Sequence, residues 1–368
     1  LTAAYFLAVA GHSVTVYDAM PKMGGMLRYG IPEYRLPKKV LDREIQEIQE
    51  LGVTLKNGVK ISKDISFEEI RKSADATVIA IGAWKSSGVG CPGEDQQGVL
   101  GGIDFLREVS LGNAPDIGKK VAVVGGGNTA MDACRTAVRL GAEEVYVVYR
   151  RTRNEMPAED IEIEEAMEEG VTFKFLTNPA EILGENGRVK AVKLQVMELG
   201  EPDASGRRSP VPVEGKFEML EVDTVIAAIG QKLEPAGFEG LEMTRKGNIS
   251  ADEATYRTSL EGVFAVGDAT NKGASIAIEA IGEANRASQV IDAYLNGREI
   301  SYRRPFVSER EVTETLKAQL AEKPHAARIK MPQRSPEVRR HDFQEINLGF
   351  AEADARAEAA RCLECGCH

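Results

Sequence analysis

The chain has 368 residues, of which 43% are hydrophobic and 28% are charged, and its formal net charge is −11. Such a composition is ordinary for a globular protein with two or three domain cores, and the negative charge argues against a nucleic-acid partner. Because no apolar run approaches the roughly 20 residues of a membrane helix, we expect a cytoplasmic protein that does not insert into a membrane.

The first residues predict a helix followed by a strand. Small and apolar residues lead to Gly11, and the strand Val14–Asp18 then ends in an acid. An acid at that position favours an adenosine ribose with free hydroxyls, as in NAD or FAD. Farther along, a periodic charged stretch predicts a surface helix over Lys38–Glu50. The segment Ala74–Gly82 is typical of a short buried strand that ends in glycine.

The segment Val121–Met131 is typical of a strand, a glycine turn and a helix. Gly125, Gly127 and Ala130 match the dinucleotide pattern G-x-G-x-x-G/A. The first glycine permits the tight turn, the second lets the backbone approach a pyrophosphate, and the third small residue lets the helix pack on the strand. The N-terminus of the helix then offers free N–H groups to the phosphates.

The next predicted strand, Val145–Tyr149, ends in Arg150 and Arg151. An NAD site has an acidic residue there, which binds the ribose hydroxyls. Two guanidinium groups instead suit a 2′-phosphate. The sequence therefore predicts an NADPH site, and the alternative is a pair of solvated arginines after an ordinary strand.

The start of the chain repeats this unit without its first part. When the two are aligned, Gly11 matches Gly141 and Leu1 falls opposite Met131. The first strand and the glycine turn of the earlier copy are therefore absent. Since the chain also lacks an initiator Met, we expect a fragment that is truncated at its N-terminus.

The segments after Arg151 predict more of the second domain and a return to the first. An acidic helix is expected over Ala158–Glu169, followed by antiparallel strands at Val189–Glu198 and Lys216–Val222, with an exposed loop at Gly200–Gly215 between them. The strand Val222–Gly230 then repeats the pattern of residues 74–82.

Two further elements complete the first domain. A strand is expected over Gly262–Asp268, and a helix of small residues over Ser275–Leu295. The two matched pairs of segments predict an α/β fold with two Rossmann-like dinucleotide-binding domains, the second inserted into the first.

Residues 301–368 predict a mostly irregular and helical C-terminal arm, with helices at Glu309–Leu320 and Ala351–Arg361. The arm ends in three of the five cysteines, whereas the other two are expected to be buried and inert. If a fourth cysteine follows in the intact protein, the three could bind an iron–sulfur cluster. The alternatives are zinc with His368 as a fourth ligand and reduced surface thiols. The three candidate metal ligands are Cys362, Cys365 and Cys367.

Four motifs together resemble the flavoprotein reductases that have two dinucleotide-binding domains, and above all the glutamate synthase small (beta) subunit and its relatives. The likeness covers roughly residues 1–300. The motifs are MGGMLRYGIPEYRLP (23–37), GGGNTAMD (125–132), YRRTRNEMPA (149–158) and FAVGD (264–268).

The resemblance implies which residues bind each cofactor. Residues 1–110 and 232–300 would form the FAD-binding domain, and residues 111–231 the NADPH-binding domain. The residues implied for FAD are Asp18, Gly24, Gly25, Gly267, Asp268 and, at the start of the helix near Ser275, Ala277. Those implied for NADPH are Gly125, Gly127, Asn128, Thr129, Arg150 and Arg151. At Gly82 and Gly230 a cofactor is expected to lie against the backbone.

The resemblance further implies hydride transfer from NADPH to FAD, with electrons passed to a glutamate synthase large subunit or a ferredoxin-like acceptor. The cofactors carry this chemistry, so no catalytic side chain is expected. No cysteine pair lies between Met20 and Glu50, which argues against a disulfide reductase. The alternatives are a non-catalytic NADPH-binding assembly subunit and a ferredoxin:NADP or sulfide-type oxidoreductase subunit. Because some relatives continue into an iron–sulfur domain, we expect the C-terminal end to be cut as well.

Overall fold

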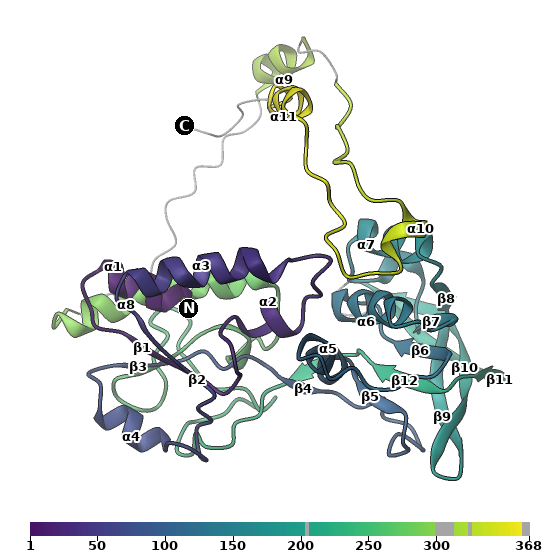
Figure 1. Ribbon diagram of the computed structural model, residues 1–368, viewed down its shortest axis with the longest axis horizontal. Helices are drawn as coiled ribbons and strands as arrows, with labels where there is room; N and C mark the ends of the chain where they lie inside the picture. The colour runs from purple at the N-terminus through teal and green to yellow at the C-terminus, as the bar shows by residue number, and fades with distance from the viewer. Residues whose placement is uncertain (203–205, 299–312, 323–325, 363–368) are drawn as a thin grey trace.

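The computed structural model describes residues 1–202, 206–298, 313–322 and 326–362. Figure 1 shows two α/β domains beside one another and a C-terminal arm that rises from the second domain. The first domain is drawn mainly in purple and green, and the second mainly in blue and teal. Helices α9 (Glu314–Ala321) and α11 (Glu352–Ala359) of the arm lie away from both domains.

The second domain is built on a parallel sheet with the strand order β5-β12-β6-β7-β8. Each neighbouring pair in this sheet is parallel. In that order, the strands are β5 (Val99–Gly101), β12 (Thr224–Ala227), β6 (Lys120–Val124), β7 (Glu144–Tyr149) and β8 (Thr172–Phe175).

Both faces of this sheet are covered, which explains why its strands are apolar without alternation. Val121 and Val123 belong to a core shared with α5 (Gly102–Ser110), α6 (Asn128–Arg139) and α7 (Asp160–Glu168). Ala122 and Val124 belong to a core on the other face, which a three-stranded antiparallel sheet covers. The strands of that second sheet are β9 (Thr177–Glu185), β10 (Arg188–Pro202) and β11 (Arg208–Glu221).

Much of the loop predicted at Gly200–Gly215 is a continuation of the strand pair β10–β11, so that prediction was wrong. Leu199 pairs with Pro210, and Met197 pairs with Pro212. The prolines suggested a loop because proline cannot donate a hydrogen bond within a sheet. β11 is an edge strand, however, and edge strands tolerate proline.

The first domain contains two parallel strand pairs. β1 (Thr15–Asp18) pairs with β2 (Thr54–Asn57), and β3 (Thr77–Ile79) pairs with β14 (Val263–Ala265). Side chains of β14 alternate between two cores: Phe264 packs in the core of α1 and α8, and its neighbours pack in the core on the other face. The helices of this domain are α1 (Thr2–Val9), α2 (Gly25–Tyr29), α3 (Lys38–Glu50), α4 (Phe67–Lys72) and α8 (Ala277–Leu295).

A short antiparallel ribbon links the domains where the chain leaves the first and returns to it. It consists of β4 (Lys85–Ser86) and β13 (Gln231–Lys232). The sheet of the second domain begins at Val99, earlier than the predicted boundary at residue 111, because the short strand β5 joins β12. β5 has only three residues and no glycine turn follows it, so the sequence pattern did not indicate which domain it belongs to.

The arm is attached to the second domain by a buried cluster of charged residues. Arg339, at the end of α10 (Pro336–Arg339), is 2% exposed, and its Nε donates to Oε1 of Glu169 at 2.9 Å. The same carboxylate accepts hydrogen bonds from Arg135 and Arg139 at 2.6–3.0 Å. We call these four residues the arginine cluster.

The loop after α2 of the first domain packs on the same place. The guanidinium carbons of Arg139 and Arg135 lie 3.8 and 5.0 Å from the centre of the Tyr34 ring. Arg35 donates two hydrogen bonds to the carboxylate of Asp132 at 2.7 and 2.9 Å. The arm joins this contact, because the N–H of Ile346 donates to the carbonyl of Tyr34 at 3.0 Å. Both domains and the arm therefore meet at α6.

We predict that Glu169→Gln destabilises the protein by about 3–5 kcal/mol at pH 7, because it removes the carboxylate shared by three buried arginines. Arg135 and Arg339 each keep a second carboxylate, at Glu165 and Glu168, whereas Arg139 has no other ion pair among the described residues. Burial would raise the pKa of Glu169, but hydrogen bonds from Arg139 and Arg135 lower it to about 2. A lowered carboxyl pKa gives stability that is present above the ordinary value of about 4.3 and is lost as the pH falls toward the folded value. The difference between variant and wild type should therefore shrink between about pH 4.3 and 2.

Denaturant unfolding at several pH values measures this difference. Glu143→Gln is the matched control, because the Glu143 carboxylate pairs with Lys119 in solvent, where both side chains are more than 60% exposed. The control should leave the unfolding midpoint almost unchanged. A Glu169→Gln variant as stable as the control at pH 7 would contradict the structural role assigned to the cluster.

Candidate functional site

The glycine turn after β6 lies where two parallel strands end side by side. Gly125 has a φ of +145°, and a Cβ atom there would lie 2.2 Å from the carbonyl oxygen of Ala228, just beyond β12. The neighbouring Gly126 leaves no room either, since its Cβ would lie 2.6 Å from the ring of Tyr149. Sequence reasoning missed the role of Gly126, although a run of three glycines, one more than the pattern requires at these positions, was a signal. The backbone of this turn is therefore bare of side chains.

The turn leads into the N-terminus of α6, where Gly127 is the N-cap. Oδ1 of Asn128 is buried and has no hydrogen-bond partner among the described residues. Thr129 accepts a hydrogen bond from Nε2 of Gln231 at 3.4 Å, a contact that the sequence did not predict. An uncapped helix N-terminus offers N–H donors that suit a phosphate, whereas the unpartnered oxygen of Asn128 is an acceptor that suits a hydroxyl or N–H group of a ligand.

The two arginines predicted for the 2′-phosphate lie in different environments. Arg150 follows β7 and is exposed. Arg151 is 5% exposed, and its Nε donates to the carbonyl of Arg208 at 2.7 Å. The structure therefore leaves Arg150 available to a ligand and gives Arg151 a structural contact with β11.

In the first domain, Asp18 ends β1 as predicted. Its Oδ1 accepts a hydrogen bond from the N–H of Met20 at 2.9 Å, and burial raises the pKa of its carboxyl group. Gly24 packs tightly, because its Cβ would lie 2.8 Å from Leu41 on α3. A Cβ at Gly25 would have no neighbour within 4 Å, so the backbone there faces open space.

The predicted residues near α8 also come together. Asp268 lies in a single turn of 3-10 helix (Gly267–Ala269), and its Oδ1 accepts a hydrogen bond from the N–H of Ser275 at 3.2 Å. Burial raises the pKa of Asp268, and nearby Glu283 raises it further. Glu283 also accepts from the N–H of Gly267 at 2.8 Å, a contact that the sequence did not indicate. Ala277 is the first residue of α8.

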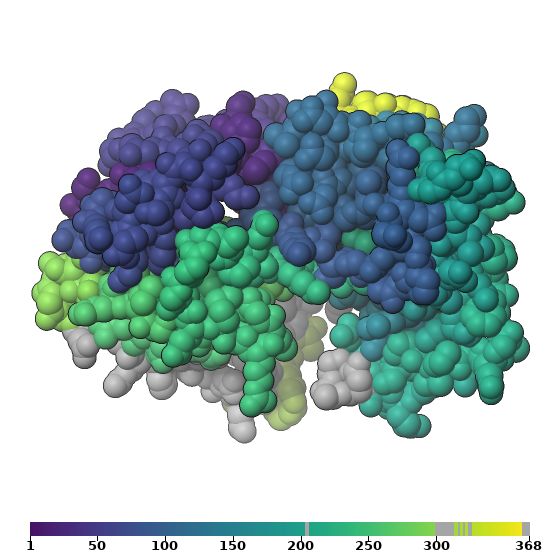
Figure 2. Space-filling view, turned by 90° about the horizontal axis from the view of Figure 1, so that it is seen from below, coloured from purple at the N-terminus to yellow at the C-terminus, as the bar shows by residue number. Residues whose placement is uncertain are grey.

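The two repeated glycines flank the linking ribbon at its opposite ends, because the ribbon pairs Ser86 with Gln231 and Lys85 with Lys232. Gly230 follows β12, and its carbonyl accepts a hydrogen bond from the N–H of Ser87 at 2.9 Å. Gly82 follows β3, and a Cβ there would lie 3.5 Å from Nε1 of Trp84. Figure 2, a view from below, shows a hollow between the green segment of the first domain and the teal segment of the second.

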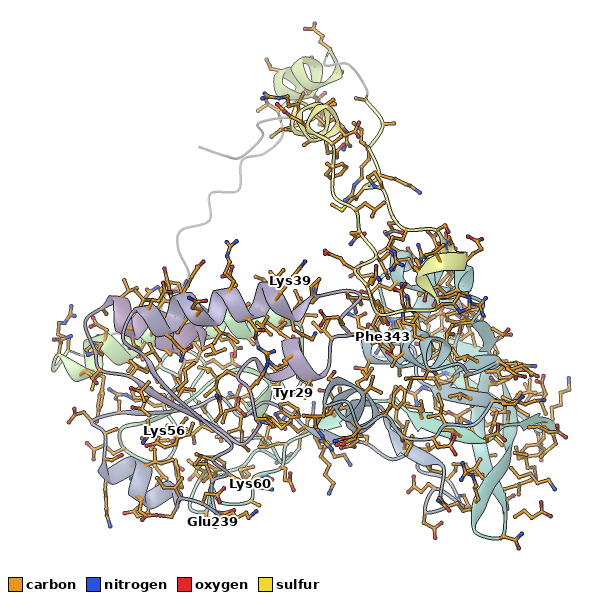
Figure 3. The ribbon with its side chains drawn as sticks, in the orientation of Figure 1. Tyr29, Lys39, Lys56, Lys60, Glu239 and Phe343 are labelled. Atoms are coloured by element: carbon orange, nitrogen blue, oxygen red, sulfur yellow. The ribbon has the colours of Figure 1, made fainter. Side chains whose placement is uncertain are left out.

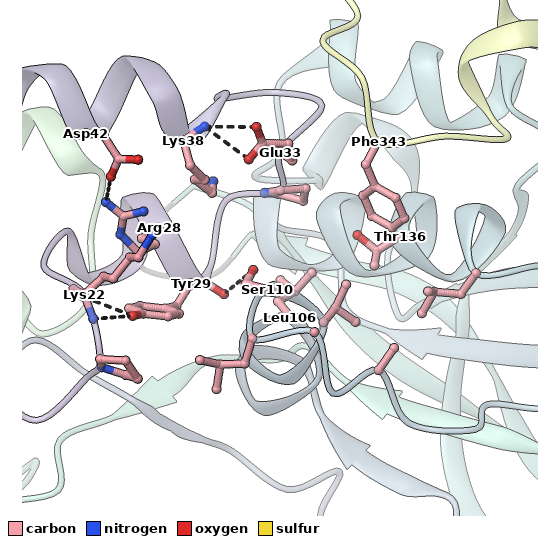
Figure 4. Close-up of a pocket in the computed structure, with 17 residues that line it drawn as sticks. Lys22, Arg28, Tyr29, Glu33, Lys38, Asp42, Leu106, Ser110, Thr136 and Phe343 are labelled. Atoms are coloured by element: carbon pink, nitrogen blue, oxygen red, sulfur yellow. Dashed lines mark hydrogen bonds and ion pairs between the residues drawn. The ribbon is translucent and has the colours of Figure 1, made fainter. Parts of the chain in front are cut away.

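A cavity of about 570 Å³ lies between the domains on the side of the arm (Figure 4). Tyr29 and Phe343 line it, and both lie at the boundary between the domains in Figure 3. Its polar groups bond one another: Tyr29 with the backbone of Lys22, and the Arg28 side chain with Asp42. None of the predicted cofactor-binding residues lines this cavity.

The predicted metal site lies almost wholly outside the described residues. Cys362 is exposed, whereas Cys365, Cys367 and His368 are not among the described residues. In the part of the chain that the structure describes, no three His, Cys, Asp or Glu side chains are grouped as metal ligands. Within the same ranges, none of the helices is both long and apolar enough to cross a bilayer.

Comparison with known proteins identifies related sequences. Residues 1–289 match the family described as pyridine nucleotide-disulphide oxidoreductase. The NADP(+)-dependent formate dehydrogenase subunit beta of Moorella thermoacetica is 43% identical over 377 residues, which cover 99% of this chain and 53% of that protein. The putative glutamate synthase (NADPH) small chain of Cereibacter sphaeroides is 40% identical over 308 residues, 80% of this chain and 74% of that one.

The chain thus spans about half the length of the Moorella relative. Among solved structures, FprA of Mycobacterium tuberculosis in complex with NADPH has a TM-score of 0.68 at 19% identity, covering 87% of this chain and 86% of that one. At this identity the likeness concerns the fold, and it confirms the predicted α/β class. The sequence relatives confirm the predicted resemblance to glutamate synthase small subunits.

We predict that Gly125→Ala destabilises the second domain by about 3–6 kcal/mol, because the new Cβ meets the Ala228 carbonyl and the backbone is strained. Gly141→Ala is the matched control: Gly141 also has a left-handed φ, +95°, but a Cβ there has nothing within 4 Å. Its cost should be about 1–2 kcal/mol. Equal losses in denaturant unfolding would show that the close approach at Gly125 does not matter.

Proposed function

Because this chain belongs to the pyridine nucleotide-disulphide oxidoreductase family, we propose that it binds FAD in its first domain and NADPH in its second, and passes electrons to a partner subunit. The observation that carries the proposal is the contrast between two matching positions. Asp18 ends the strand after the first helix of one domain, and Arg150 follows the matching strand of the other. A carboxylate suits a ribose with free hydroxyls, and a guanidinium suits a 2′-phosphate.

The residues of the first domain fit FAD. Open space in front of Gly25 lets the pyrophosphate or ribityl chain lie against the backbone. Asp268, held by the N–H of Ser275, is placed to accept a hydrogen bond from a sugar hydroxyl. The N-terminus of α8 begins at Ala277, and its dipole favours negative charge on a nearby ring.

The residues of the second domain fit NADPH. The bare turn at Gly125 and Gly127 admits a pyrophosphate, and the N-terminus of α6 provides N–H donors for it. The unpartnered Oδ1 of Asn128 is an acceptor for a polar group of the nucleotide. Together, the two cofactors supply hydride transfer, and the protein sets their positions and excludes competing reactions.

The partner is inferred by chemistry and by the names of relatives. The Moorella and Cereibacter proteins are named as a subunit and a small chain of oxidoreductases. We therefore propose a glutamate synthase large subunit, or a ferredoxin-like or formate-oxidising module, as the electron acceptor or donor. An iron–sulfur cluster at Cys362, Cys365 and Cys367 would suit such a transfer.

The proposal is tested on the protein as its gene encodes it, mixed with FAD and freed of excess. Binding should quench the fluorescence of Trp84, the single tryptophan of these 368 residues, which lies beside Gly82. Anaerobic NADPH should then bleach the visible absorption of the flavin. Binding of NADPH without binding of FAD would favour the rival function, a non-catalytic assembly subunit.

We predict that Arg150→Ala weakens NADPH binding about 10- to 150-fold, the equivalent of about 1.5–3 kcal/mol for a charge-assisted hydrogen bond, and leaves NADH binding unchanged. Arg151→Ala should instead lower the melting temperature, because Arg151 is buried and bonds to the backbone of Arg208. Titration of both nucleotides and thermal unfolding separate these effects. If Arg150→Ala weakens NADPH and NADH equally, Arg150 does not bind the 2′-phosphate.

A further inference from the structure

We propose that Arg208, on the hairpin β10–β11 of the antiparallel sheet, supplies a second guanidinium group to the 2′-phosphate and so sets the preference for NADPH over NADH. This inference rests on the proposed NADPH site and names a residue that lies more than fifty positions from the fingerprint in sequence. It assigns to the antiparallel sheet a part in cofactor selection.

Two hydrogen-bond routes tie the hairpin to the carboxyl end of β7. The carbonyl of Arg208 accepts from Nε of Arg151 at 2.7 Å, which places β11 one residue from Arg150. On the β10 side, the N–H of Leu176 donates to the carbonyl of Arg151, and the N–H of Met197 donates to the carbonyl of Leu176, at 3.1 and 2.7 Å. The start of β11 is therefore held at the edge of the sheet where the ribose would lie.

The side chain of Arg208 is exposed and ordered at the same time. Its Nε and Nη2 donate to the carbonyls of Gly200 and Leu199 at 3.1 and 2.7 Å, which holds the guanidinium on the hairpin. The charge of Arg208 acts on the loop after Arg150. Hydrogen bonds from Thr152 lower the pKa of the Glu155 carboxyl group, and the nearby positive charge of Arg208 lowers it further. Ordering a guanidinium before the ligand arrives reduces the entropy lost on binding.

The chemistry of the ligand matches two guanidinium groups on different elements. A 2′-phosphate carries up to two negative charges and three acceptor oxygens, more than one arginine fork neutralises. Arg151 is turned into the protein and bonded to the hairpin backbone, so its contribution is to position β11. Arg208 is the exposed cation that this contact brings to the site.

The experiment measures binding of 2′,5′-ADP and 5′-AMP to the protein by calorimetry, without FAD and without turnover. Arg208→Gln keeps an N–H donor on the side chain and removes the charge. We expect it to weaken 2′,5′-ADP about ten- to a hundredfold and to leave 5′-AMP within about twofold. Arg188→Gln is the matched control, because Arg188 is an exposed arginine at the other end of β10, 3.7 Å from Asp116. It should change neither affinity.

The outcomes separate this inference from the proposed function. If the wild type binds 2′,5′-ADP no better than 5′-AMP, the NADPH assignment itself fails. If the wild type prefers 2′,5′-ADP and Arg208→Gln keeps that preference, only the role of Arg208 is overturned. Circular dichroism and the melting temperature of each variant establish that it is folded. Equal weakening of both nucleotides by Arg208→Gln would mean that the residue supports the hairpin and does not bind phosphate.

Discussion

One buried carboxylate, Glu169, holds together parts of the chain that are far apart in sequence. It is inaccessible to solvent and accepts hydrogen bonds from arginines of α6 and of the arm. Burying any one of these charges without its partners would cost free energy of folding, because water is excluded from the cluster. The elements that carry the charges must therefore pack together. The position of α6 is fixed in this way, and the N-terminus of α6 is where the second nucleotide is proposed to bind.

The same helix also determines how the two domains face each other. Tyr34 of the first domain stacks on Arg139, and Arg35 binds Asp132 on α6. In Figure 1, α6 lies below the arm, whereas β4, which pairs with β13, lies lower in the view where the domains are linked. Two separate connections resist rotation of one domain against the other. The proposed hydride transfer would require the reacting rings of the two cofactors to be held in contact, and a fixed domain orientation would favour this.

The sequence predicted the features that local patterns encode. The helix Lys38–Glu50 has the predicted bounds, because its apolar residues recur with a helical period. The two repeated strands both occur, although β3 ends at Ile79 and β12 at Ala227, each three residues before the predicted glycine. The linking ribbon follows both strands. Contacts between distant segments were not predictable. No sequence pattern near Arg339 indicated that it would be buried against Glu169. The prolines of β11 predicted a loop where the structure has an edge strand.

The different positions of Arg150 and Arg151 show why the residues after one strand do not provide two cations for a 2′-phosphate. Both arginines lie in the bend after β7, where Arg150 faces solvent and Arg151 turns inward to the backbone of Arg208. The sequence motif contains both guanidinium groups, but the fold leaves only that of Arg150 exposed to a ligand. A second cation has to come from another element. Arg151 is bonded to the backbone of Arg208 on the hairpin, so the arginine that is turned away from the proposed phosphate site positions the arginine that is proposed to take its place.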